Sequence, residues 1–161
     1  MAGNTLVAYY SMSGNTRRIA NEIREATGAD IEEIGEIKPR KGMGGAIRAL
    51  LDAVTRRTPP ILVAAHDPAD YDLLVIGGPV WAGRIASPVR TYAKRYGTHA
   101  QHVAFFCTEG GRGAQSAFAD LQKLCQRAPE ATLAVDAEHL PQVEHHVALG
   151  RFTAQISPTR H

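Results

Sequence analysis

The apolar and polar positions of the chain divide it into two alternating kinds of segment. Short runs rich in apolar residues predict buried strands. The five runs are residues 5–10, 29–34, 72–78, 102–107 and 131–136. Three of them are almost continuously apolar, which is typical of strands covered on both faces of a sheet.

Between these runs, apolar residues recur at helical spacing. The first predicted helix covers about 16–27, and Pro88 is a good first-turn residue for the third. The apolar faces, in chain order, are Ile19, Ala20, Ile23 and Ala26; Ala46, Ile47, Leu50, Leu51 and Val54; Val89, Tyr92, Ala93 and Tyr96; Ala117, Phe118, Leu121 and Leu124; and, more weakly, Val143, Val147 and Phe152. Strands that alternate with helices of this length imply crossover connections and a parallel sheet.

The length and composition fit one soluble globular domain of the α/β class over residues 1–161. The chain has 44% hydrophobic and 21% charged residues, without repeats. Residues 56–71 are expected to form a long connection and residues 157–161 a loose tail.

No apolar run approaches the roughly 18 residues of a membrane span, and the chain enters a strand pattern too early for a signal peptide, so a cytoplasmic location is expected. The two cysteines, Cys107 and Cys125, make no disulfide framework and are predicted to be small buried hydrophobes.

Three loops follow the carboxyl ends of the first, third and fourth predicted strands, where open parallel sheets bind ligands. They are residues 11–16, 78–83 and 108–113. The first offers donors from Ser11, Ser13, Asn15 and Thr16, and Gly14 lets backbone amides converge at a helix start. A helix dipole gives an anion only about 0.3–1 kcal/mol. Hydrogen bonds to a charged group give roughly 1.5–3 kcal/mol each, so several of them favour a phosphate cup over a plain serine-rich helix cap.

The second and third loops suit a flat ligand. Trp81 is the only tryptophan, and it stands between Gly-Pro and Gly just past a buried strand, where its ring could stack on an aromatic group. The third loop has three glycines within residues 110–113, which permit close approach of the backbone to a ligand.

Together these loops resemble those of the flavodoxin family, in order along nearly the whole chain. "SMSGNT" is similar to the family's phosphate loop for FMN, "GPVWAG" to the loop beside the isoalloxazine ring, and "TEGGRG" to the loop at the ring's pyrimidine edge. The resemblance implies a doubly wound five-stranded parallel sheet with strand order 2-1-3-4-5, the order for which flavodoxin is a standard example. The stretch 136–141 is short, as in the family's short form.

The resemblance also implies the roles of particular residues. The implied phosphate ligands are Ser11, Met12, Ser13, Gly14, Asn15 and Thr16. The residues implied to flank the ring are Pro79, Val80, Trp81, Ala82 and Gly83, with a carbonyl near Ala82 or Gly83 as acceptor for N5 of the reduced flavin. Those implied to hold the polar edge of the ring are Thr108, Glu109, Gly110 and Gly111.

Two departures from electron-shuttling flavodoxins bear on the function. The chain is slightly basic, whereas those flavodoxins surround the flavin with acidic residues. Its third loop has no tyrosine, so one face of the isoalloxazine ring is expected to be open. These features favour an oxidoreductase that takes hydride from NAD(P)H and reduces a quinone or similar small-molecule acceptor. A carrier of single electrons between redox partner proteins is the alternative, and a cofactor-free interaction module is the third. Short flavodoxin-like enzymes, which the chain resembles, often pair so that a neighbour closes the flavin site, and the sequence leaves such a homodimer open.

Other motifs are weaker. Residues 38–57 carry six basic residues and one acidic residue. A solvated helix face is favoured over a binding site for the 2′-phosphate of NADPH or for an acidic redox partner. The stretch has too few aromatic residues to favour nucleic acid as a ligand. "GRGAQS" lacks the third glycine of a dinucleotide fingerprint. Cys107 and Arg112 are one residue too close for a Cys-x5-Arg phosphatase loop. His139, His145 and His146 are predicted to be surface histidines rather than metal ligands.

Overall fold

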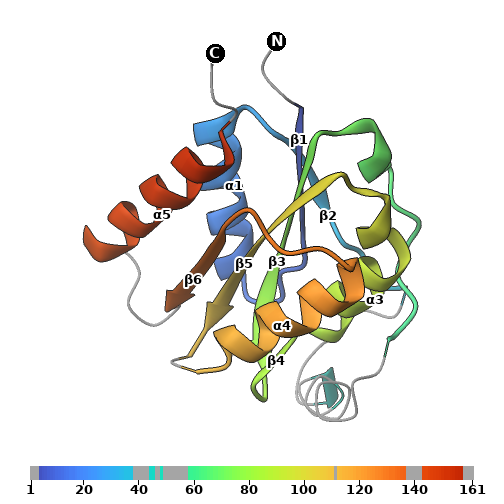
Figure 1. The fold of residues 1–161 in the computed structure, drawn as a ribbon. Coiled ribbons are helices and arrows are strands. Elements are labelled where there is room, and N and C mark those ends of the chain that lie inside the picture. The colour runs from blue at the N-terminus through green and yellow to red at the C-terminus, as the bar shows by residue number, and fades with distance from the viewer. Residues whose placement is uncertain are drawn as a thin grey trace.

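In a computed structural model of the chain, a parallel β-sheet lies between two layers of helices (Figure 1). The structure describes residues 4–37, 44, 45, 48, 58–110, 112–136 and 143–157. The parallel strands are β1 (Thr5–Tyr9), β2 (Asp30–Glu33), β3 (Leu73–Trp81), β5 (His102–Glu109) and β6 (Thr132–Asp136). Their order is β2-β1-β3-β5-β6, so the predicted strand order is confirmed.

Four described helices cover the two faces of the sheet. The helices α1 (Asn15–Thr27) and α5 (Val143–Ile156) lie on one face, and α3 (Ser87–Tyr96) and α4 (Ala114–Cys125) lie on the other (Figure 1). Short 3-10 turns, η1 (Pro68–Asp70) and η2 (Gly97–His99), complete the connections. The helix predicted over 46–54 lies outside the described residues apart from Arg48, which is helical. None of the described helices is long and apolar enough to cross a membrane.

The central strands are buried on both faces, as their continuous apolar patterns predicted. In β1, Leu6 and Ala8 pack in the core beneath α3 and α4, whereas Val7 and Tyr9 pack in the core beneath α1 and α5. All five residues of β1 are buried. Both cysteines are buried and free, as expected.

The predicted helix faces are correct except near helix ends and in α5. Ala26 is exposed in the last turn of α1, and Val147 is exposed in α5. Phe152 is buried in α5 as predicted, and His145 and Ile156, which lie on the same side of the helix, are buried with it. Ser157 continues the hydrogen bonding of this helix, its amide donating to the carbonyl of Thr153 at 3.0 Å, and the rest of the predicted tail lies outside the described residues.

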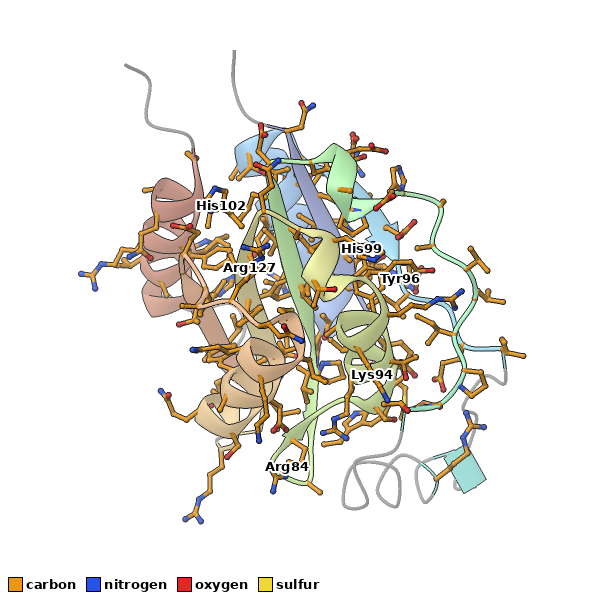
Figure 2. All side chains as sticks on the ribbon, turned by 45° about the vertical axis from the view of Figure 1, so that its right-hand side comes forward. Arg84, Lys94, Tyr96, His99, His102 and Arg127 are labelled. Carbon is orange, nitrogen blue, oxygen red and sulfur yellow. The ribbon has the colours of Figure 1, made fainter. Side chains whose placement is uncertain are left out.

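The third strand is longer than predicted. β3 continues to Trp81, since a short antiparallel strand, β4 (Arg84–Ile85), pairs with its end. Ala82 and Gly83 both have positive φ, 49° and 76°, as in the tight turns that join antiparallel strands. Arg84 is at the lower end of the molecule in Figure 2, on this hairpin. The predicted loop 78–83 is therefore mainly a strand end and a two-residue turn.

The long connection 56–71 runs, over its described part, along the outer edge of β2. Ile61 forms an isolated antiparallel bridge with Glu36, and the amide of Leu62 donates to the carbonyl of Gly35 at 2.7 Å. The backbone of this segment therefore pairs with the chain just past β2, and the amides of Ala65 and His66 donate to the side chain of Glu32 on β2.

Candidate functional site

The first and third predicted loops meet at the carboxyl edge of the sheet. The hydroxyls of Thr16 and Thr108 share a hydrogen bond of 2.8 Å, and both residues are buried. Thr16 is in the first turn of α1, and Thr108 is near the end of β5. Because β1 and β5 both pair with β3, the sheet places these two strand ends on either side of the β3 end.

The first loop presents a left-handed turn before α1. Gly14 is the N-cap residue with φ 97°, and its amide donates to the hydroxyl of Ser11 at 3.0 Å. Gly14 has no side chain with which to cap the amides of the first helical turn, and Met12 and Ser13 are exposed. A helix start with accessible amides and hydroxyls can accept an anionic group.

The second loop, corrected to a hairpin, places Trp81 against the end of β1. The Trp81 ring lies half-buried and edge-on to the ring of Tyr10, with centroids 5.6 Å apart and planes at 89°. Tyr10, in turn, donates its hydroxyl proton to Glu36 Oε1 at 2.6 Å. The sequence pattern did not single out Tyr10, although the aromatic pair at the end of the first strand was a visible signal.

The third loop packs directly against the hairpin. A Cβ on Gly113 would lie 2.6 Å from Val80 Cγ1 and 2.9 Å from the Cα of Gly83, so only glycine permits this approach. Gly113 also has φ 102°. The carboxylate of Glu109 accepts from the amide of Ala114 at 3.0 Å and thereby caps α4. Gly111 lies outside the described residues.

Carboxylates around the first loop are already bound by the chain's own donors. Glu33 pairs with Arg17 at 2.6 Å, and Glu36 pairs with Arg48 at 3.0 Å. A cavity of about 300 Å³ opens beside the loop. Its walls are Tyr10, Ser11, Met12, Glu33, Ile34, Gly35 and Glu36. This volume lies at the lower end of the range for ligand pockets.

The weaker motifs are resolved where the structure describes them. Burial, and then the charge of Glu109, raises the pKa of Cys107 to about 12, which argues against a nucleophilic thiolate. The surface prediction was wrong for His145, which is buried with Nε2 2.8 Å from Glu22 Oε2. It was correct for His146, which is exposed, while His139 lies outside the described residues. The described residues contain no group of three or more histidine, cysteine or acidic side chains that could hold a metal ion.

Comparisons with known proteins agree on the fold. A family model described as flavodoxin matches residues 4–136. The crystal structure of a flavoprotein from Lactobacillus acidophilus in complex with FMN has a TM-score of 0.71 and 26% identity, and the match covers 85% of this chain and 95% of that one. The apo-form of the Lactobacillus flavoprotein, solved by NMR, gives a TM-score of 0.64 at 27% identity, over 86% and 95%.

More distant structures share the fold alone. A protein of Bacteroides eggerthii has a TM-score of 0.73 at 20% identity, covering 93% of this chain and 98% of its own. None of the curated proteins matches the chain. Because the family model covers most of the sequence, the chain belongs to the flavodoxin family.

Proposed function

We propose that this chain is an FMN-binding redox protein whose three strand-end segments hold the cofactor. In this proposal Ser11–Thr16 bind the phosphate, residues 79–83 flank the ring, and residues 108–111 hold its polar edge. The observation that carries the proposal is the Thr16–Thr108 hydrogen bond, since it brings the first and third segments together. The close packing of Gly113 on the hairpin adds the second segment.

The residues present fit FMN in their chemistry. The first loop combines hydroxyls with a left-handed glycine before a helix, which suits a phosphate dianion. Arg17 and Arg18 next to it pair with Glu33 and Glu22, so their charge is directed to carboxylates of the chain. The phosphate would therefore be held mainly by hydroxyls and backbone amides.

The hairpin supplies a platform for a flat ring. Trp81 is braced edge-on by Tyr10, which fixes the plane of the indole without covering both of its faces. The turn at Ala82 and Gly83 is exposed, so its backbone groups can reach a ligand. When bound, FMN would supply the hydride and electron chemistry, while the protein supplies binding, orientation and electrostatics.

We further propose an FMN-dependent oxidoreductase that uses NAD(P)H to reduce a quinone or similar acceptor. The described third loop, Thr108 to Gly110, contains no aromatic residue, which favours one open face on the ring. The carboxylates of Glu33, Glu36 and Glu109 are each bound by donors within the chain. They therefore do not form the acidic surface with which an electron carrier would bind a redox partner protein. The carrier function remains the alternative that the family membership favours.

Titration with FMN tests cofactor binding. FMN fluorescence and the fluorescence of Trp81 should both be quenched on addition of the full chain. Ser13→Ala with Thr16→Ala should weaken FMN binding by about tenfold or more, because each lost hydrogen bond to a charged group is worth roughly 1.5–3 kcal/mol. Arg17→Ala with Arg18→Ala is the matched control and should bind FMN nearly as well as the wild type. Absence of any quenching would end the proposal.

A second experiment separates the oxidoreductase from the carrier. Under anaerobic conditions, NADH or NADPH should bleach the flavin absorbance of the loaded protein, and a benzoquinone should restore it with turnover. Reductive titration with dithionite should show little paramagnetic signal. No reduction by either nicotinamide, together with a long-lived flavin radical, would favour the carrier while leaving FMN binding intact.

A further inference from the structure

Tyr10 lies between two of the segments assigned above to FMN. It directly precedes Ser11 of the first loop, and its amide donates to the carbonyl of Gly77 in β3 at 3.1 Å. It is 7% exposed and belongs to the core beneath α3 and α4, in which Trp81 also packs. The backbone of Tyr10 is therefore fixed to the strand that leads to the hairpin.

A short hydrogen bond to a carboxylate fixes the direction of the Tyr10 ring. The hydroxyl donates to Glu36 Oε1 at 2.6 Å. Hydrogen bonds from a hydroxyl to an ionised carboxylate are shorter and stronger than those between neutral groups. Because the phenol oxygen lies on the long axis of the ring, this bond holds that axis in one direction.

Glu36 is itself held by its backbone and by its side chain. Its backbone forms the antiparallel bridge with Ile61, and its Oε2 atom accepts from Arg48 Nη2 at 3.0 Å. The side chain of Glu36 is only 4% exposed. A rotation of the carboxylate would break two charge-assisted hydrogen bonds where little water can replace them, so Glu36 is a rigid anchor for Tyr10.

The ring of Tyr10 passes this constraint on to Trp81. The two rings are edge-on with centroids 5.6 Å apart, which is within the range that aromatic pairs prefer. Trp81 is half-buried at the end of β3, next to the exposed turn at Ala82 and Gly83. A half-buried indole can change rotamer unless a neighbour holds it. Because Glu36 fixes Tyr10, the contact with Tyr10 sets the plane of the indole.

We propose that Glu36 is a positioning residue for the flavin. Through Tyr10 it sets the plane of Trp81, and thereby the orientation of the isoalloxazine ring that lies against the indole. This inference rests on the proposed function, because it takes Trp81 as a residue that flanks the ring. Glu36 need not touch the cofactor, and its effect is on how the ring is held rather than on how the phosphate is bound.

Fluorescence of the apoprotein tests the first half of this proposal, because Trp81 is the only tryptophan. Glu36→Ala leaves both aromatic rings in place and should lower the fluorescence anisotropy of Trp81. Glu36→Gln keeps an acceptor for the Tyr10 hydroxyl and should restore most of the anisotropy. Equal losses in Glu36→Gln and Glu36→Ala would mean that Glu36 supplies charge rather than position, and would overturn the proposal.

Two tyrosine variants complete the test in the apoprotein. Tyr10→Phe removes only the hydroxyl, should also lower the anisotropy of Trp81, and serves as an independent test if Glu36→Ala does not fold. Tyr9→Phe is the matched control, because Tyr9 is the buried neighbour of Tyr10 in the core on the other face of the sheet. The Tyr9→Phe variant should leave the anisotropy unchanged.

The visible circular dichroism of bound FMN tests the second half, because it depends on the orientation of the ring within the protein. It should change in Glu36→Ala and in Tyr10→Phe, while the FMN dissociation constant rises only severalfold. Ser13→Ala with Thr16→Ala should do the opposite, with much weaker binding but unchanged dichroism at saturation. A changed affinity with unchanged flavin dichroism in both Glu36→Ala and Tyr10→Phe would indicate a merely structural role and refute the proposal.

The two proposals fail in different ways. If the wild type binds no FMN, the cofactor proposal is wrong, and the role of Glu36 toward the flavin is wrong with it, whatever the anisotropy of Trp81 shows. If the wild type binds FMN but neither the anisotropy of Trp81 nor the flavin dichroism responds to Glu36→Ala, only the positioning proposal is overturned.

Discussion

The hydroxyls of Thr16 and Thr108 meet at 2.8 Å although the residues are 92 positions apart in the chain. The bond joins the start of the first helix to the end of the fourth parallel strand, and both side chains are buried. Neither residue alone specifies a ligand site. Their contact makes two separate loops parts of one surface.

Thr108→Val should destabilise the protein, because it keeps the shape of the side chain and leaves the Thr16 hydroxyl buried without its partner. The expected loss is about 1–3 kcal/mol in the free energy of unfolding, measured by urea denaturation without FMN. The double variant with Thr16→Val should lose less than the sum of the two single changes. Thr132→Val, at an exposed position of β6, is the control and should change stability little. Additive losses would contradict the importance of the bond.

Gly77→Ala should destabilise the sheet. A Cβ at this position of β3 would overlap the ring of Phe106 on the neighbouring strand. Overpacking of this kind costs about 1–3 kcal/mol or more, which thermal and urea unfolding would both detect. Gly150→Ala is the matched control, because a Cβ there meets nothing within 4 Å and α5 gains a better helix former. It should raise stability by roughly 0.5–1 kcal/mol. Equal effects of the two changes would contradict the packing of Phe106.

The two cysteines should resist alkylation in the folded protein. Burial raises the pKa of Cys107 and of Cys125 to about 12. At pH 8 the thiolate would then be roughly one part in ten thousand, and reagent access would require local opening. Mass spectrometry after iodoacetamide treatment should find both thiols unmodified under native conditions and both modified in denaturant. Fast native modification of Cys107 would reopen the possibility of a reactive thiol at the end of β5.

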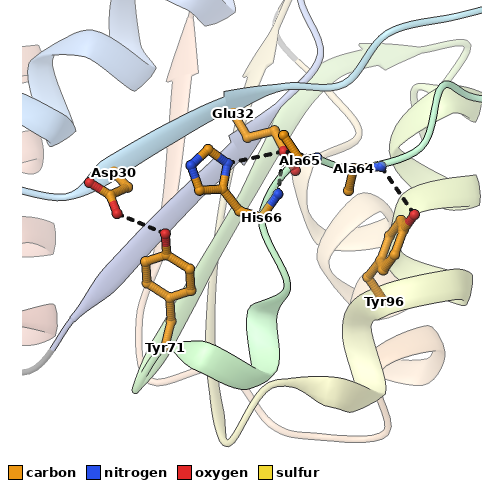
Figure 3. Close-up of polar contacts among 7 residues, drawn as sticks. All are labelled: Asp30, Glu32, Ala64, Ala65, His66, Tyr71 and Tyr96. Atoms are coloured by element: carbon orange, nitrogen blue, oxygen red, sulfur yellow. Dashed lines mark hydrogen bonds and ion pairs between the residues drawn. The ribbon is translucent and has the colours of Figure 1, made fainter.

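The protein should lose stability in alkali through Tyr71. Burial, and then the hydrogen bond of 2.7 Å to Asp30, raises the pKa of Tyr71 to about 12 (Figure 3). The pKa of Tyr71 is higher in the folded protein than the value of about 10 in the unfolded chain, so the unfolded chain loses the phenol proton at a lower pH. The stabilisation that neutral Tyr71 gives the folded state is therefore lost as pH rises from about 10 to about 12. Tyr71→Phe should flatten the stability profile in that window. A profile identical to that of the wild type would show that the Tyr71 phenol is not stabilised in its neutral form.

The sequence alone located the five parallel strands and the described helices, because continuous apolar runs and helical periods are local signals. The order of the sheet was implied by the resemblance to the flavodoxin family and did not follow from these periods. The sequence also located the first loop, since hydroxyls, a glycine and a helix start are adjacent in the chain. The family follows from the same local motifs in their order. The sequence predicted the buried face of α5 only in part. Val147 has the spacing of a core residue but is exposed, whereas His145 is buried against Glu22.

The tertiary structure decided which distant groups meet. The antiparallel pairing of β3 with β4 turned a predicted loop into a hairpin and set Trp81 edge-on to Tyr10. The position of the connection 61–66 beside β2 brought the amides of Ala65 and His66 onto the buried carboxylate of Glu32. Spacing along the chain encodes the period of each element, but register, crossover path and side-chain orientation depend on the packing of the whole molecule.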